Sequence, residues 1–195
     1  MKFNTEHYYR GMLINFLCKK HSFNRYLELG VDIGLTYNQI DEYISKTGVD
    51  MNPNIAKNYT SVQCCDTDTF FETNTKQFDI VLIDACHEKH QIHKDFENSF
   101  RCLSDNGIIL IHDINPPDEK STELTGFGNS FEWWVNMCEH YNLSTYVDFN
   151  NDALGIFYKN INPSLRSFVN KEISYVYFHN NRNRYIYNLE MSDPL

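Results

Sequence analysis

Short runs of apolar residues alternate with amphipathic segments along most of the chain. Apolar runs of about four to eight residues that close on a polar residue or a glycine are typical of buried β-strands. Runs of this kind lie at residues 25–30, 47–52, 61–66, 78–85 and 107–114. The last two are apolar at nearly every position, so we expect a sheet that is covered on both faces.

Apolar positions spaced three or four residues apart predict helices around these strands. The segment 5–20 has this spacing and carries lysines at its C-terminal end, which favours an entry helix. We expect further helices at 35–46, at 88–107, where an Asn-Gly pair ends the pattern, and at 129–141. Strands that alternate with helices predict parallel pairing through right-handed crossovers.

The pattern changes after residue 128. Two strand-like segments, 143–150 and 154–159, flank a turn-rich Asn-Asn-Asp-Ala sequence and predict an antiparallel hairpin. Added to the five runs above, this hairpin completes a sheet of seven strands. The expected fold class is therefore α/β, with a doubly wound, mostly parallel sheet and an antiparallel C-terminal hairpin.

A single folded unit is expected from the length and composition. The chain has 195 residues, of which 42% are hydrophobic and 15% aromatic, which is enough for one domain with a substantial core. We divide this domain, 1–195, into an N-terminal helix at 1–21, a sheet core at 22–160 and a C-terminal extension at 161–195. The extension combines a helix with an aromatic-rich segment that should pack against the domain or a second subunit, so a homo-oligomer is left open.

Acidic residues outnumber basic residues, 26 to 17, and the net charge is −9. Because the sequence has no stripe of lysines or arginines, we expect neither a nucleic-acid nor a membrane partner. The charged start of the chain and the lack of a run of about eighteen apolar residues predict no signal peptide and no membrane span. Six cysteines without a C-x-x-C pair favour reduced thiols and a cytoplasmic protein.

Polar residues end the predicted parallel strands, at the edge where doubly wound sheets bind their ligands. The residues at these strand ends are Glu28, Gly30, Asp50, Asp66, Asp84, His87, His112 and Asp113. Gly30, Gly34 and, twenty residues after Gly30, Asp50 form an arrangement similar to a dinucleotide-binding loop. The motif is incomplete, because Asp32 stands where such a loop has its second glycine.

The charge of this loop distinguishes between two cofactors. The carboxylates of Glu28 and Asp32 would repel a pyrophosphate, which needs neutral amides and a helix dipole. The same carboxylates would attract a ligand that carries an ammonium and a sulfonium group. The sequence therefore favours S-adenosylmethionine over NAD at this site.

The segments YLELGVDIG, GVDMNP, CCDTDTF, FDIVLIDACH and NGIILIHDINPP follow one another along the chain. With these motifs in this order, the chain resembles the class I S-adenosylmethionine-dependent methyltransferases, and among them the small sugar O-methyltransferases of the TylF/MycE type. The resemblance covers 22–160 and implies a Rossmann-like core. It also implies a cofactor site made of Glu28, Gly30, Gly34, Asp50, Met51, Cys65, Asp66 and Asp84.

The same resemblance implies a role for several of these residues. Glu28 and Gly30 would border the methionine part of the cofactor, and Asp50 would bind both ribose hydroxyls. Asp66 or its neighbour Cys65 would lie at the adenine. Methyltransferases of this group usually have a small residue at the position of Asp32, so the loop departs from the family pattern there.

The predicted reaction is the methylation of a hydroxyl oxygen on a small acceptor such as a sugar or glycoside. This transfer needs a base for the hydroxyl proton, and imidazole titrates near neutral pH. His87 is the expected base, because it lies three residues after Asp84, as a catalytic histidine does in the enzymes that the chain resembles. Asp84 and Asp113 are expected to hold a metal or to position the acceptor.

The resemblance also implies a divalent cation, held by an acid at the end of the fourth strand and an acidic pair at the end of the fifth. Asp84 and Asp113 match this pattern, but His112 replaces the first member of the pair. Imidazole is a poor ligand for Mg²⁺ and a good ligand for Mn²⁺, Fe²⁺ or Zn²⁺. A cation such as Mg²⁺ or Mn²⁺ at these three residues and a metal-independent site are therefore both open.

Two other motifs in the sequence resemble known sites but are incomplete. His87 and His90 are one residue closer than the spacing of an H-E-x-x-H zinc helix. An Asn-Pro-Pro sequence precedes Asp118, where a DNA adenine methyltransferase needs a stacking aromatic residue. We instead expect the polar segment 118–130 to form a lid over the acceptor. A catalytically silent subunit that binds S-adenosylmethionine or a nucleoside, and an NAD-dependent oxidoreductase, are the alternatives left open.

Overall fold

The structure, a computed structural model, describes residues 6–123, 126–148 and 152–186. These residues form one seven-stranded sheet in the order β3-β2-β1-β4-β5-β7-β6. The strands are β1 (Arg25–Leu29), β2 (Ser45–Asp50), β3 (Val62–Cys64), β4 (Phe78–Ile83), β5 (Leu103–Ile111), β6 (Ser144–Val147) and β7 (Ala153–Tyr158). Strands β1 to β5 pair in parallel, whereas β7 and β6 form an antiparallel edge. The predicted fold class and the C-terminal hairpin are confirmed.

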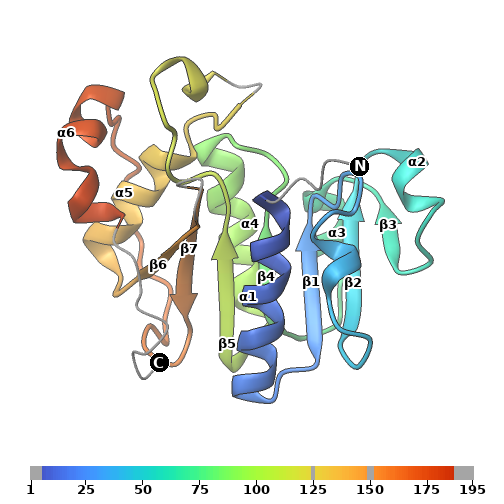
Figure 1. Cartoon of the computed structure of the whole chain (residues 1–195). Coiled ribbons are helices and arrows are strands. Elements are labelled where there is room, and N and C mark those ends of the chain that lie inside the picture. Colours follow the sequence, from blue (N-terminus) through green and yellow to red (C-terminus); the bar gives the residue numbers. More distant parts are fainter. Residues whose placement is uncertain (1–5, 124–125, 149–151, 187–195) are drawn as a thin grey trace.

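Helices lie on both faces of this sheet, as Figure 1 shows. They are α1 (Glu6–His21), α2 (Pro53–Ala56), α3 (Thr67–Thr73), α4 (Lys89–Cys102), α5 (Ser130–His140) and α6 (Tyr175–Tyr185), with the 3-10 turns η1 (Tyr37–Gln39) and η2 (Lys120–Thr122). Side chains of α1 pack with Ile80 and Leu82 of β4, and side chains of α4 and α5 pack with Val81 and Ile83. Because helices cover both faces, every residue of β4 is buried. None of the helices within the described ranges is long and apolar enough to cross a membrane.

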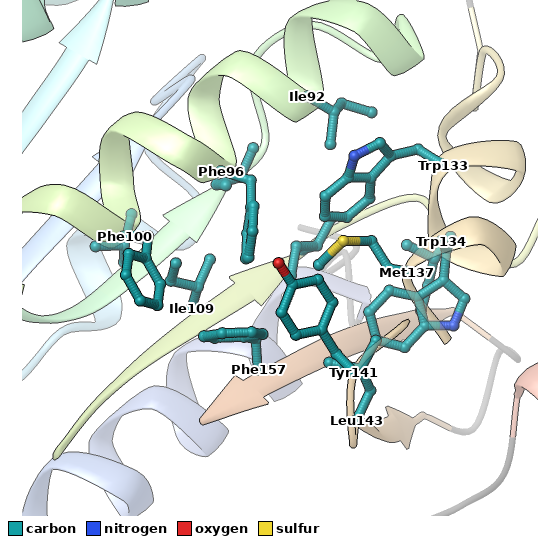
Figure 2. Packing of buried hydrophobic residues seen from close by; sticks show 14 of the residues in the cluster. Ile92, Phe96, Phe100, Ile109, Trp133, Trp134, Met137, Tyr141, Leu143 and Phe157 are labelled. Atoms are coloured by element: carbon teal, nitrogen blue, oxygen red, sulfur yellow. The ribbon is translucent and has the colours of Figure 1, made fainter. Parts of the chain in front are cut away.

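The face that α4 and α5 cover is rich in aromatic side chains, as Figure 2 shows. The ring centroid of Phe96 lies 4.9 Å from that of Phe157 on β7 and 5.5 Å from that of Trp133 on α5. Aromatic rings at such separations add packing energy beyond their buried area. The start of α5 is also tied to the sheet, because the Ser130 hydroxyl donates a hydrogen bond to the carbonyl of Asp113. Helix α5 therefore fixes the segment before it close to the strand ends.

The C-terminal extension packs against this domain. Phe178 and Tyr185 of α6 are buried, and the indole of Trp134 donates a 3.0 Å hydrogen bond to the Tyr185 carbonyl. Arg182 donates a 2.6 Å hydrogen bond to the carbonyl of Pro116 in the loop after β5. Of the two arrangements expected for the aromatic residues, the structure thus shows packing within the chain.

The prediction of a helix at 35–46 is wrong. Only the short turn η1 is helical in this segment, and β2 already begins at Ser45. Tertiary contacts compete with the helix, since the Asn15 side chain on α1 bonds the carbonyl of Gln39 and the amide of Asp41. The pairing of β2 with β1 then draws the end of the segment into the sheet.

The helix predicted at 88–107 is shorter than expected. Helix α4 ends at Cys102, because Leu103 pairs with Phe78 and begins β5. The Asn-Gly pair lies inside the irregular start of that strand and does not end the helix. Parts of the predicted entry helix, lid, hairpin turn and C-terminal extension, at 1–5, 124–125, 149–151 and 187–195, lie outside the described residues.

Candidate active site

Two adjacent cavities open at the carboxyl edge of the sheet. The first cavity, of about 450 Å³, is lined by Gly30, Val49, Asp50, Met51, Asn52, Cys65, Asp66, Thr67, Asp68, Ala85, Cys86 and Gln91. The second cavity, of about 380 Å³, is lined by Arg10, Glu28, Gly30, Val31, Asp32, Leu35, Thr36, Asp50, Asn52, Asp84, Ala85, His87, His112 and Asp113. Four residues line both cavities, so a ligand that extends from one into the other passes Gly30, Asp50, Asn52 and Ala85.

The loop after β1 forms part of both cavity walls. Gly30 has a φ of 84°, and a Cβ atom there would collide with the carbonyl oxygen of Asp84. Asp32 also adopts a left-handed conformation, with a φ of 47°, which aspartate tolerates better than most residues. The loop therefore keeps a glycine-like path although Asp32 replaces the usual small residue. Gly34 packs against the Tyr59 hydroxyl and is not among the lining residues of either cavity.

The carboxylate of Asp50 organises this loop from the end of β2. Its Oδ2 atom accepts hydrogen bonds from the amides of Val31, at 3.1 Å, and Asp32, at 2.8 Å. Its Oδ1 atom accepts a 2.7 Å hydrogen bond from the amide of Asn52. A carboxylate has about four acceptor sites, so Asp50 keeps the capacity to accept a hydrogen bond from a ligand.

The far wall of the first cavity comes from the residues that follow β3, from α3 and from α4. Asp66 caps α3 by accepting a 2.7 Å hydrogen bond from the Thr69 amide, and this bond lowers the pKa of Asp66. Met51 is 73% exposed at the rim. Gln91 of α4, which sequence reasoning missed, bonds the Thr67 hydroxyl at 3.1 Å. The predicted cofactor residues at the ends of β2 and β3 are thus brought together around one cavity.

Glu28 lies beneath the second cavity and is 1% exposed. The hydroxyl of Tyr26 donates a 2.6 Å hydrogen bond to its carboxyl group. Burial raises the pKa of Glu28 to about 8, so the carboxyl is largely protonated at neutral pH. The expectation that Glu28 adds negative charge to the loop is therefore corrected. The carboxylates of Asp32 and Asp50 lie at this loop, and those of Asp84 and Asp113 also line the second cavity.

Beside this loop, Asp84 forms ion pairs with two cationic side chains. The Nη1 atom of Arg10 lies 2.6 Å from Asp84 Oδ2, and the Nδ1 atom of His112 lies 2.8 Å from Asp84 Oδ1. His112 in turn reaches Asp152 through Nε2, at 3.0 Å. Sequence reasoning missed Arg10 and Asp152, because they are 74 and 40 residues from their partners and no local pattern connects them.

The mutual attraction of these charges affects the pKa values of Asp84 and His112 more strongly than burial does. Burial alone would raise the pKa of Asp84, but the charge of His112, its hydrogen bond and the charge of Arg10 hold that pKa below its ordinary value. Burial alone would lower the pKa of His112, but Asp84 and Asp113 raise it well above its ordinary value. Protonated His112 thus compensates the carboxylates around it.

His87 is oriented by the segment that was predicted to form a lid. Its Nδ1 atom lies 2.6 Å from the carbonyl oxygen of Gly126, and because a carbonyl only accepts, Nδ1 carries a proton. Its Nε2 atom therefore faces the cluster, 3.1 Å from Asp113 Oδ2 and 3.8 Å from Asp84 Oδ1. Burial opposes protonation of His87, but these two carboxylates raise its pKa above the ordinary value.

The side chains Asp84, His87, His112 and Asp113 also fit a divalent cation. One donor atom from each lies within 4.8 Å of the others. The second nitrogen of each histidine is engaged by an oxygen outside this group, from Gly126 and Asp152 respectively, as is usual for histidines that bind metals. The predicted metal residues are therefore brought together with a second imidazole beside them.

The histidines and the cysteine near His87 in the sequence, His90, His93 and Cys86, lie apart from this group. His90 is exposed. His93 accepts a 3.3 Å hydrogen bond from the indole of Trp133 and packs edge-on against Phe168. Cys86 lines the first cavity and does not belong to the donor group found among the described residues. Of the three histidines at 87, 90 and 93, only His87 therefore belongs to this group.

Comparisons with known proteins agree with this fold. A family model described as a methyltransferase domain matches residues 8–114, which is more than half of the chain. Cofactor-bound Rv0187 from MTB is similar in structure, with a TM-score of 0.60 and 13% sequence identity over 82% of this chain and 82% of that chain. A comparison with curated protein sequences found no match.

Two further solved structures have similar folds. The O-methyltransferase TomG from Streptomyces achromogenes, in complex with SAM, has a TM-score of 0.53 and 14% identity, covering 75% of this chain and 78% of that chain. The SAH-bound methyltransferase PaMTH1 from Podospora anserina has a TM-score of 0.57 and 16% identity, covering 77% and 78% respectively. At such identities the likeness shows the fold alone.

The sheet order and the antiparallel hairpin define a Rossmann-like methyltransferase fold of class I, the class whose methyl donor is S-adenosylmethionine. The chain belongs to the methyltransferase domain family whose model it matches.

Proposed function

We propose that the protein transfers a methyl group from S-adenosylmethionine to a hydroxyl oxygen of a small acceptor, with a sugar or glycoside as the expected class. The observation that carries this proposal is the orientation of His87, whose Nε2 atom faces Asp84 and Asp113 in the second cavity. This cavity shares part of its wall with the first cavity. The arrangement supports a base at the boundary where donor and acceptor would meet.

The first cavity suits the adenosine part of the donor. Asp50 has acceptor capacity for ribose hydroxyls, and Cys65 or Asp66 would lie at the adenine, with Met51 beside them. The methionine part would extend past Gly30 into the second cavity. We propose that the residues that bind the cofactor are Glu28, Gly30, Asp50, Met51, Cys65, Asp66 and Asp84. Gly34 packs against Tyr59 and would support the shape of the loop after β1.

The chemistry proposed for the second cavity is a displacement at carbon. The acceptor oxygen attacks the methyl carbon, the carbon–sulfur bond breaks, and S-adenosylhomocysteine leaves. Neutral His87 takes the hydroxyl proton at Nε2, while Asp84 and Asp113 position the acceptor. A divalent cation held by Asp84, His112 and Asp113, when bound, would make the acceptor hydroxyl more acidic.

The surroundings of the site support a small acceptor. A cavity of about 380 Å³ is in the range of small-molecule sites, and the net charge of −9 disfavours nucleic acid and anionic lipid as partners. All six cysteines are free thiols, which favours the cytoplasm. A homo-oligomer stays compatible with this assignment.

Two measurements test the proposal. Calorimetric titration with S-adenosylhomocysteine and with NADH separates a methyltransferase from an NAD-dependent oxidoreductase, and we expect only the former ligand to bind. Transfer of labelled methyl from S-adenosylmethionine to a panel of sugars and glycosides then tests turnover. Binding of S-adenosylhomocysteine without transfer to any hydroxyl compound would favour the catalytically silent subunit and contradict the proposed reaction.

A further inference from the structure

Both nitrogens of His112 are engaged by carboxylates from different parts of the fold. Nε2 lies 3.0 Å from Asp152 Oδ2, and Nδ1 lies 2.8 Å from Asp84 Oδ1 and 3.1 Å from Asp113 Oδ1. Asp152 precedes β7 and is itself held in the hairpin, because its amide donates a 3.0 Å hydrogen bond to Asp148. The antiparallel hairpin thus supplies the residue that orients His112.

This orientation decides which nitrogen of His112 faces the other site residues. Protonated His112 donates Nε2–H to Asp152 and directs Nδ1–H at the oxygens of Asp84 and Asp113. A cation that binds Nδ1 would replace that proton and leave Nε2–H donated to Asp152, because a histidine ligand binds through a deprotonated nitrogen. Nδ1 lies 2.8 and 3.1 Å from these oxygens, so the three residues can offer donor atoms to one ion. The other oxygen of Asp84 is held by Arg10.

We propose that Asp152 makes the site formed by Asp84, His112 and Asp113 selective for Mn²⁺ over Mg²⁺, by fixing the His112 tautomer that presents Nδ1. Mg²⁺ prefers oxygen ligands, whereas an imidazole nitrogen favours the transition ions. The inference rests on the metal residues named in the proposed function, but it concerns ion binding and not turnover. Asp152 is a positioning residue, since it acts through His112.

The test is ion binding to the full chain after treatment with a chelator. Free Mn²⁺ is followed by electron paramagnetic resonance during titration with MnCl₂, and MgCl₂ is then added as a competitor. We expect Mn²⁺ to bind at one site and Mg²⁺ to displace it only in large excess. Asp152→Ala should weaken Mn²⁺ binding about 10–100-fold, the usual effect of removing a residue that orients a metal ligand.

A reciprocal variant tests the selectivity itself. His112→Asp replaces the nitrogen donor with oxygen, so Mg²⁺ should bind more tightly and the preference for Mn²⁺ should fall. His90→Asp makes the same change at an exposed histidine outside the site and should leave both affinities unchanged. Binding of S-adenosylhomocysteine, measured by calorimetry, shows that each variant is folded.

Three outcomes would overturn the inference: no Mn²⁺ binding by the wild-type chain, equal affinities for Mn²⁺ and Mg²⁺, or unchanged Mn²⁺ affinity in Asp152→Ala. If the wild-type chain binds S-adenosylhomocysteine and fails in any of these ways, only the ion assignment is wrong. If it binds Mn²⁺ but no S-adenosylhomocysteine, the proposed function is wrong while the ion site stands.

Discussion

The first cavity and the charged group around Asp84 lie side by side, yet they are assembled differently. The cavity takes most of its lining from the end of β2, the segments that follow β1, β2 and β3, and the start of α3, and several of these residues, such as Met51 and Asp66, are exposed. The charged group joins α1, the ends of β4 and β5, and the C-terminal hairpin through Arg10, Asp84 and Asp152. The proposed donor site is therefore built from segments next to the strand ends, whereas the proposed reactive group depends on contacts between distant parts of the chain.

This difference suggests that substitutions in the two regions should separate in their effects. Changes in the first cavity should weaken donor binding and leave the reactive group intact. Changes in the charged group at residues other than Asp84, which is also assigned to the donor, should affect turnover, stability or pH dependence while donor binding persists.

The largest expected effect is that of His87→Gln. Removal of a general base typically lowers the rate about 10²–10⁴-fold, so turnover should fall by this amount while the affinity for S-adenosylhomocysteine stays within experimental error. Single-turnover transfer of labelled methyl measures the rate. His90→Gln, at an exposed position of the same helix, is the control, and equal rates in both variants would remove His87 from the mechanism.

Arg10→Ala should produce the next largest effect, on stability. The substitution leaves the carboxylate of Asp84, which is 19% exposed, without its guanidinium partner, and breaking such a buried pair costs about 3 kcal/mol or more. Lys94→Ala breaks the exposed pair with Asp68, 3.2 Å long, and should cost less than about 1 kcal/mol. Denaturant unfolding measures both, and equal losses would contradict the contrast between the two regions.

Asp50→Ala should act on donor binding. The carboxylate accepts hydrogen bonds from the loop after β1, so its loss removes both a ligand contact and the support of that loop. Hydrogen bonds to charged groups are worth about 1.5–3 kcal/mol, so the dissociation constant for S-adenosylhomocysteine should rise about 10–100-fold. Asp105→Ala, at an exposed position near the start of β5, should bind normally. Unchanged affinity in Asp50→Ala would move the donor out of the first cavity.

The smallest expected effect is a shift of the pH profile. Because the pKa of His87 is raised above its ordinary value, its neutral form is lost as the pH falls below this raised pKa. The rate should therefore increase as the pH rises through that value and then level off. Asp113→Asn removes one of the charges that raise the pKa, so the midpoint of kcat/KM against pH should move to lower pH. A midpoint that stays in place would show that another group controls the profile.

Much of this architecture was predictable from local patterns. The buried strand β4 is recognisable from its unbroken apolar run. The expected strand ends also identified Asp50, Asp84, His87 and Asp113 as candidate site residues, and all four line the second cavity. The helix expected at 35–46 failed, because Asn15 of α1 bonds that segment and β1 pairs with its end. Periodicity describes how a segment would fold alone and contains no information about such competing contacts.

The sequence by itself determined the layered fold and the edge at which the candidate site residues gather. The apolar pattern sets which residues form strands, and the carboxyl ends of parallel strands share one edge of the sheet. The tertiary structure alone decided that Glu28 is buried and largely neutral, that Arg10 compensates Asp84, and that Asp152 orients His112. Charge states depend on burial and on separations of a few ångströms. Distance along the chain does not reveal either quantity.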